Sequence, residues 1–214
     1  MVLPNVLPDH SKRIHTRAEM IIGLDVSTSV VGITVLNDKG KLISVDHVDL
    51  RKISSEEQAY KALLVHKKLK EIEISAEHHQ HAHCDWKVYI EAAAKKFGAR
   101  LSNADTIFTL ARFNGAVSYC AYDVFGIEPI QIDPKTARKT AWVEIPKIPK
   151  ATKPYDRKKL IKQAIIDYTL EFQTEEEMGY EKTRHDNFHE WCGDRADSYV
   201  IAKAGLLLSK KEKD

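Results

Sequence analysis

Four acidic residues occupy positions in the sequence where carboxylates could do chemistry. Asp25 and Glu91 each end a short apolar run, and Asp194 and Asp197 stand three residues apart before a third apolar segment. Burying a carboxylate without a partner costs several kcal/mol, and four together would repel one another unless cations lay between them. Hard divalent cations such as Mg²⁺ take oxygen ligands, and a pair of them can cleave phosphodiesters. The four acids therefore predict a catalytic centre with two Mg²⁺ ions, for which Mn²⁺ can substitute.

Each of these acids also has a purely structural interpretation. Asp25 precedes a turn, where Asp is common, and Glu91 could be an early residue of an Ala-rich helix. Asp194 could be a helix N-cap, with Asp197 as a charge in the first turn. Any one of the four is explained more readily by structure than by catalysis, but the set together favours a shared site. His189, five residues before Asp194, is a candidate proton relay.

The elements that must position these acids follow from hydrophobic periodicity and turn signals. Strands are predicted at 20–26, 30–37, 41–49, 87–91 and 128–132, and helices at 54–74, 103–125, 156–172 and 193–209, with a short helix opened by Asp133-Pro134. A turn signal at 37–40 predicts antiparallel pairing, whereas helical connections predict parallel later strands. The result is an α/β domain with a mixed five-stranded sheet, three strands antiparallel and two parallel, flanked by helices. Its first and fourth strands would bring Asp25 and Glu91 to one rim.

Length and composition predict one globular domain. The 214 residues suit a single domain at 19–209, with a flexible leader at 1–18 and a charged tail at 210–214. No apolar run approaches the ~20 residues that cross a bilayer, and the N-terminus lacks the order of a secretory signal. Three widely spaced cysteines do not make a disulfide framework, which favours a reducing, cytoplasmic location.

Charge is segregated along a chain whose net charge is only +2. Residues 135–162 contain ten Lys or Arg against two acids, and residues 171–190 contain seven acids against two basic residues. The basic segment is a candidate surface for a polyanion such as DNA, although a solvated loop and helix face would explain the charge equally well. Three prolines predict that 144–155, inside this segment, is an exposed loop.

Five short motifs follow one another along the chain, at 22–32, 88–91, 103–116, 133–140 and 193–202. In this order they resemble the motifs of the RuvC-type Holliday junction resolvases. The resemblance implies a ribonuclease H-like fold, with Asp25, Glu91, Asp194 and Asp197 as the catalytic, metal-binding carboxylates. It also implies a homodimer that binds four-way DNA junctions and nicks two opposing strands, in DNA recombination and repair.

The resemblance further implies which residues contact DNA. Basic residues after the fifth strand and at the start of the next helix would lie near the scissile phosphate, and their counterparts are Lys135, Arg138, Lys139, Arg157 and Lys158. An aromatic residue that works at the junction centre has Phe97 as its candidate counterpart.

The chain departs from the family pattern in three respects, one of which is that the Pro-rich loop and the acidic stretch 171–190 look like additions. Val26-Ser27 stands where Pro-Gly usually follows the first aspartate, and alanines at 92–94 stand where the aromatic residue is common. These departures indicate a divergent member, such as one from a phage or virus. The expected location is then the host cytoplasm, and otherwise the nucleoid.

Two other functions stay open on sequence alone. Residues 24–28 are similar to the first phosphate loop of actin-like ATPases and sugar kinases, but 214 residues leave no room for the duplicated domain of that class. A non-catalytic nucleic-acid-binding module on the same fold is the other alternative, and it does not explain the four acids.

Histidines and tryptophans have less specific interpretations. The His-rich run 77–84 could bind a metal, but its irregular spacing makes a surface loop the simpler interpretation. His185, His189 and Cys192 have a helix-like spacing that could hold zinc, although only three ligands are evident. Trp86, Trp142 and Trp191 are predicted to be packing anchors, with base stacking as the alternative for Trp142.

Overall fold

The computed structural model describes residues 18–76, 84–93 and 104–212. Its elements, in chain order, are β1 (Glu19–Val26), β2 (Val30–Asn37), β3 (Leu42–Asp49), α1 (Gln58–Ala76), β4 (Asp85–Glu91), α2 (Ala104–Phe125), β5 (Ile130–Ile132), α3 (Pro134–Thr140), α4 (Pro154–Leu170) and α5 (Glu190–Lys211). The strands form one sheet in the order β3-β2-β1-β4-β5. β1, β2 and β3 pair antiparallel, and β4 and β5 continue from β1 in parallel. This is the mixed sheet that the sequence predicts.

Local sequence explains why the first strands pair antiparallel. Between β2 and β3, the Asn37 side chain accepts hydrogen bonds from the N–H groups of Lys39 and Lys41 at 3.0 and 2.9 Å. Gly40 follows at a φ of 83°, a left-handed conformation that costs glycine little. Between β1 and β2, the Ser27 hydroxyl oxygen accepts a backbone N–H at 3.0 Å. Connections this short can only reverse the chain.

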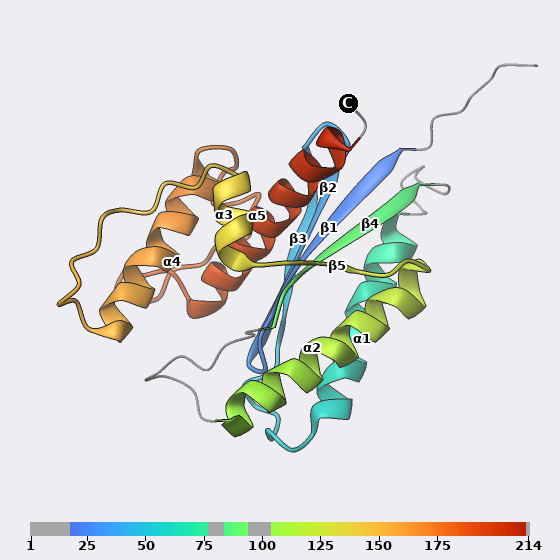
Figure 1. Ribbon diagram of the computed structural model, residues 1–214, viewed down its shortest axis with the longest axis horizontal. Coiled ribbons are helices and arrows are strands. Elements are labelled where there is room, and N and C mark those ends of the chain that lie inside the picture. The colour runs from blue at the N-terminus through green and yellow to red at the C-terminus, as the bar shows by residue number, and fades with distance from the viewer. Residues whose placement is uncertain (1–17, 77–83, 94–103, 213–214) are drawn as a thin grey trace, which may run out of the picture.

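Helices lie on both sides of the sheet, with α1 and α2 on one face and α5 on the other, where α3 and α4 pack against α5 (Figure 1). β1 lies at the centre, and its side chains alternate between two apolar cores. Ile22 and Leu24 pack with α1 and α2, whereas Ile21 packs with α5. Since both faces are covered, β1 has a continuous apolar sequence and not an alternating one.

Two glycines allow α5 to lie close against the sheet. A Cβ atom on Gly23 would collide with the backbone of Ser198 and Ala202, and a Cβ atom on Gly32 would collide with the carbonyl group of Asp194. A larger side chain at either position would push α5 away from the strands. Both glycines belong to the first sequence motif, so this motif also fixes where α5 sits.

Several element boundaries differ from the predicted ones. α1 begins at Gln58, after turns in which the Glu57 carboxylate accepts the Ser54 N–H at 3.2 Å. α4 begins at Pro154, because proline suits the first helical turn. α5 runs from Glu190 to Lys211 and so takes in the start of the predicted tail. β5 has three residues where five were expected.

The three tryptophans have different environments. Trp86 packs on Phe125 with ring centroids 4.8 Å apart, and Trp191 is buried against His47. Trp142 is 71% exposed, so its prediction as a packing anchor is wrong. The reason is that α3 ends just before it and the chain turns outward there.

Part of the sequence-based organisation lies beyond the described residues. This applies to the leader up to residue 17 and to 77–83 of the His-rich run, and the division into leader, domain and tail stays a prediction. Within the described ranges, no helix combines the length and the apolar character that crossing a bilayer requires.

Candidate active site

Asp25 and Glu91 come together because their strands are neighbours. β1 and β4 pair in parallel, with Leu24 opposite Ile90, so the C-terminal ends of both strands lie at one rim of the sheet. Asp25 is 7% exposed, and its carboxyl group shares a hydrogen bond with that of Glu91. Glu91 is the last residue of β4 and does not open a helix. The sheet thus builds one half of the acidic cluster.

α5 brings the other two acids to the same rim. Asp25 pairs across the sheet with Gly32, and the carbonyl group of Asp194 lies directly over this glycine. Asp197 follows one helical turn later, and the side chains of Asp194 and Asp197 are only 13% and 15% exposed. The N-cap of α5 is His189, so the interpretation of Asp194 as an N-cap is wrong. The structure therefore brings together the four acids that the sequence singled out.

Burial and mutual repulsion raise the pKa of three of these carboxyl groups. For Asp25, burial, the hydrogen bond with Glu91 and the charges of Glu91 and Asp194 raise the pKa well above its usual range. Burial also raises the pKa of Glu91, and the charge of Asp197 adds to it. Burial and the charge of Asp25 raise the pKa of Asp197 to about 7. The cluster therefore needs added positive charge before all its members can be anionic at neutral pH.

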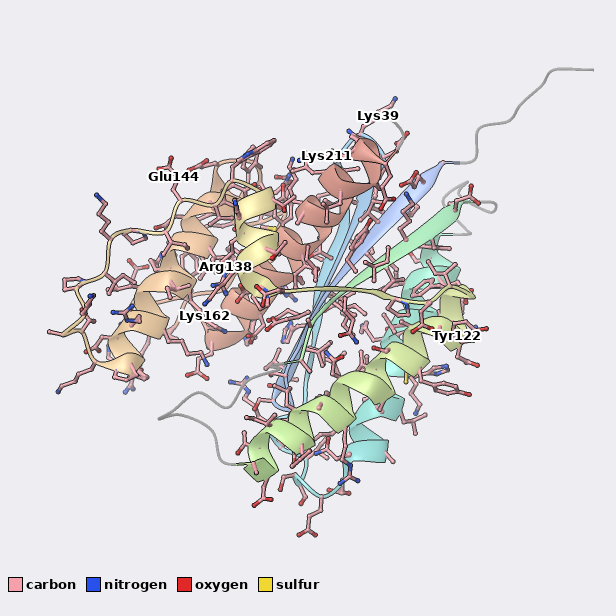
Figure 2. The ribbon with its side chains drawn as sticks, in the orientation of Figure 1. Lys39, Tyr122, Arg138, Glu144, Lys162 and Lys211 are labelled. Atoms are coloured by element: carbon pink, nitrogen blue, oxygen red, sulfur yellow. The ribbon has the colours of Figure 1, made fainter. Side chains whose placement is uncertain are left out.

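Two basic side chains supply part of this charge. Lys162 Nζ on α4 donates a hydrogen bond to Asp194 Oδ1 at 2.6 Å, and Arg138 Nη2 on α3 lies 3.8 Å from Asp197 Oδ1. Figure 2 shows both side chains beside the first turns of α5. Although burial lowers the pKa of Lys162, the charges of Asp194, Asp197 and Asp25 outweigh it and raise the pKa above its usual value. Lys162 therefore stays an ammonium ion.

Lys162 belongs to the basic segment of the sequence, but no sequence motif gives it a role in the site. A signal for it exists in the helical spacing. Ile165, Ile166 and Thr169 form the buried face of α4, and Lys162 continues that face one turn toward the N-terminus. A lysine on a buried helix face needs an anionic partner, which Asp194 provides here.

The predicted DNA contacts fall in different places. Arg138 reaches the acidic cluster. Three others are exposed on α3 and α4, namely Lys135, Lys139 and Lys158. Arg157 instead donates from Nη2 to the carbonyl oxygen of Pro149 at 3.0 Å and so fastens the Pro-rich loop to α4. Phe97 lies outside the described residues.

The histidines near the start of α5 do not form a metal centre. His189 stacks on Trp191 with ring centroids 5.8 Å apart, and its role as a proton relay stays a prediction. The Cys192 thiol is buried and donates to the carbonyl oxygen of Glu181 at 3.5 Å. In the part of the chain that the structure describes, no three His, Cys, Asp or Glu side chains are arranged to hold an ion. The zinc hypothesis for His185, His189 and Cys192 therefore finds no support.

Among the described residues, the four acids are likewise not arranged to hold an ion, and their contacts give the reason. The carboxyl groups of Asp25 and Glu91 are hydrogen-bonded to each other, and Lys162 Nζ binds an oxygen of Asp194. The chemistry of the donors nevertheless fits a hard divalent cation. Buried carboxyl groups that resist ionising together gain most from a bound positive charge, and oxygen is the donor that Mg²⁺ prefers.

The strand order and the helix layers define a ribonuclease H-like domain, as the sequence predicts. Solved structures agree. Thermus thermophilus RuvC in complex with a Holliday junction substrate matches with a TM-score of 0.53 and 14% identity, over 90% of this chain and 96% of that one. A second Thermus thermophilus RuvC structure matches with a TM-score of 0.50 and the same identity and coverage. The fold prediction is confirmed.

The remaining comparisons add little. An exopolyphosphatase from Cytophaga hutchinsonii, at a TM-score of 0.35 and 10% identity, covers 56% of this chain and 36% of its own and is too distant to carry an argument. No protein-family model and no curated protein matches the chain.

Proposed function

We propose that this protein is a metal-dependent, structure-selective DNA endonuclease that resolves four-way junctions by paired nicking. The meeting of Asp25, Glu91, Asp194 and Asp197 at one rim of a ribonuclease H-like sheet is the observation that carries the proposal. The RuvC structure that shares this fold contains a Holliday junction substrate, which supports branched DNA as the substrate class. The activity would serve DNA recombination and repair.

In this proposal the four carboxylates hold two Mg²⁺ ions, or Mn²⁺ in their place. Bound there, the ions would activate the attacking water and stabilise the leaving 3′ oxygen. The chain contributes a largely buried cluster, which strengthens every charge interaction inside it. Arg138 and Lys162 border the cluster and direct positive charge at the scissile phosphate, where negative charge grows in the transition state.

The exposed lysines next to the cluster are proposed to hold the DNA backbone. Lys135 and Lys139 on α3 and Lys158 on α4 lie on the two helices that carry Arg138 and Lys162. Contacts of this kind release counterions from DNA, so junction binding should weaken steeply as salt rises.

A cleavage assay tests the proposed function. We expect Mg²⁺ to be required for nicks in two opposing strands of a labelled synthetic four-way junction, while a linear duplex of the same sequence stays intact. Reactions with EDTA give the baseline. Hydrolysis of added ATP would instead support the kinase-like alternative, and junction binding without cleavage in either Mg²⁺ or Mn²⁺ would support the non-catalytic module.

We also propose that two copies pair through α2. Phe108, Tyr119 and Tyr122 are 61%, 69% and 49% exposed and lie along one stripe of this helix, and Figure 2 shows Tyr122 pointing away from the sheet. The same stripe contains Gly115, where an added Cβ would meet nothing within 4 Å. A glycine inside a helix costs roughly 0.5–1 kcal/mol relative to alanine. An open glycine among exposed aromatics is therefore best explained by the close approach of a second helix.

Substitution of Tyr119 by Glu is expected to break this dimer. In light scattering, the wild-type protein should have twice the mass of a single chain. The dissociation constant of the variant dimer should be about 30-fold higher or more, as for a central interface residue. The matched control is Tyr60→Glu, which changes an exposed tyrosine on α1 and should leave the dimer intact. A wild-type protein that is monomeric at tens of micromolar would contradict the proposal.

A further inference from the structure

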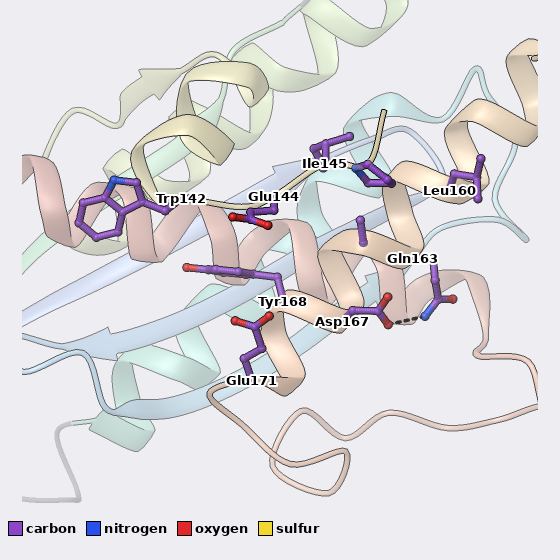
Figure 3. Close-up of a pocket in the computed structure, with 10 residues that line it drawn as sticks. Trp142, Glu144, Ile145, Leu160, Gln163, Asp167, Tyr168 and Glu171 are labelled. Atoms are coloured by element: carbon purple, nitrogen blue, oxygen red, sulfur yellow. Dashed lines mark hydrogen bonds between the residues drawn. The ribbon is translucent and has the colours of Figure 1, made fainter. Parts of the chain in front are cut away.

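A groove lies between α4 and the segment that follows α3 (Figure 3). Its volume is about 740 Å³, and its apolar lining includes Trp142, Ile145 and Leu160. Lys162 reaches Asp194 from the opposite side of α4. The groove is therefore separate from the proposed nuclease site, and a molecule bound in it would leave the acids open.

Trp142 is presented to solvent at one end of this groove. It is 71% exposed and has a φ of 58°, in the left-handed region that bulky residues rarely adopt. The backbone is held there by hydrogen bonds on both sides, from Trp142 N to Lys139 O at 3.3 Å and from Val143 N to Arg138 O at 2.9 Å. A strained and exposed indole beside a cavity is typical of a side chain that is kept for contact with another molecule.

The charge of the groove is opposite to that of the surrounding segment. Among the described residues, Glu144, Asp167 and Glu171 line it and no Lys or Arg does, although half of its lining, from Trp142 to Leu160, belongs to the basic segment 135–162. In the view of Figure 3, the carboxyl groups of Glu144 and Glu171 lie on either side of the Tyr168 side chain. Asp167 accepts a hydrogen bond from Gln163 Nε2 at 2.8 Å, and Tyr168 donates to the carbonyl oxygen of Ala141 at 2.6 Å. The walls are thus fixed, and the groove disfavours an anion such as DNA.

The combination of indole, carboxylates and apolar walls selects one kind of cation. A guanidinium group is planar and weakly hydrated, so it can stack on an indole while its N–H groups bind carboxylates in pairs. An ammonium group lacks the flat face and is more strongly hydrated. The apolar side chains of Leu160 and Ile145 can then contact an aliphatic residue that lies next to the cationic residue in the same ligand.

We propose that this groove binds a segment of a partner protein that carries an arginine next to an aliphatic residue. The arginine stacks on Trp142 and pairs with Glu144 and Glu171, and the aliphatic side chain covers Leu160. The proposal does not depend on the nuclease activity, because none of these residues belongs to the acidic cluster or to the proposed DNA contacts.

A fluorescein-labelled ten-residue peptide with two Leu-Arg pairs, followed by anisotropy, is the probe that tests this. We expect a dissociation constant of roughly 10 μM at low salt. Trp142→Ala and the double change Glu144→Gln with Glu171→Gln should each weaken binding about tenfold or more. The same peptide with citrulline in place of arginine, which keeps the shape without the charge, should not bind, and a lysine version should bind more weakly.

Matched controls separate a specific site from general attraction to acidic surface. Glu56→Gln with Glu128→Gln removes two exposed carboxylates elsewhere and should leave the affinity unchanged. Junction cleavage should be unchanged in the groove variants. Equal binding by the groove variants, equal binding of the citrulline peptide, or displacement of the peptide by DNA would each overturn the proposal.

Discussion

Asp25→Asn is expected to abolish junction cleavage while leaving junction binding intact. Asn keeps the size of the side chain but cannot carry the negative charge that a divalent cation requires. Asp25 is also the most buried of the four acids, and its charge interacts with those of the other three. Its loss should therefore reduce the rate by a factor on the order of 10³ or more, or roughly 4 kcal/mol of transition-state stabilisation.

Single-turnover cleavage of a labelled junction, beside a gel-shift assay on the same samples, measures this effect. Asp38→Asn is the matched control, since it makes the same chemical change at an exposed turn residue between β2 and β3. Junction binding by the Asp25 variant should equal or exceed that of the wild type, because one negative charge near the DNA has gone. A variant that still cleaves within tenfold of the control would show that the catalytic site lies elsewhere.

Asp25 and Glu91 could be found from the sequence because each stands at the end of a strand that the sequence also reveals. Apolar runs mark β1 and β4, and a charged residue directly after such a run must lie at the rim of the sheet. The turn at 37–40 and the helical connections then fix the strand order, which brings Asp25 next to Glu91. Local chemistry therefore carries most of the information about this half of the site.

The other half depends on packing that sequence patterns do not express. α5 reaches the rim because Gly23 and Gly32 leave room for it, but glycines also occur in strands at bulges and sharp bends, where no helix approaches. Whether Lys162 or Leu160 enters the site depends on which side of α4 packs against α5. The sequence does not reveal that side, because the helix is only weakly amphipathic. Trp142 shows the same limit, since its exposure follows from where α3 ends and not from its residue type.

Gathering these acids in one place costs stability, and this cost can be measured. The pKa of Asp197 is raised from an ordinary 3.8 to about 7, by burial first and by the charge of Asp25 second. A raised pKa means that the folded state holds the proton more tightly than the unfolded chain does. The contribution of Asp197 to stability is therefore fully present below about pH 4 and is lost as the pH rises through 7.

Asp197→Asn is accordingly expected to stabilise the metal-free protein at pH 8. A rise in pKa from 3.8 to about 7, in which the lowering effect of the Arg138 charge is already included, corresponds to roughly 4 kcal/mol. We expect a rise in Tm of roughly 10 °C at pH 8 in EDTA for a chain of this length, with no gain at pH 4. Thermal unfolding at both pH values, with Asp38→Asn as the control, measures it.

Mg²⁺ should reverse the order of the two proteins. A ligand that binds only the folded state raises its stability in proportion to the logarithm of its concentration over Kd. Saturating Mg²⁺ should therefore raise the Tm of the wild type at pH 8 and raise that of Asp197→Asn much less, since the variant has lost both a carboxylate and the repulsion that the cation relieves. A variant that is less stable than the wild type in EDTA at pH 8 would mean that Asp197 is not strained by its ionised neighbours. An equal response of both proteins to Mg²⁺ would mean that Asp197 takes no part in binding the metal.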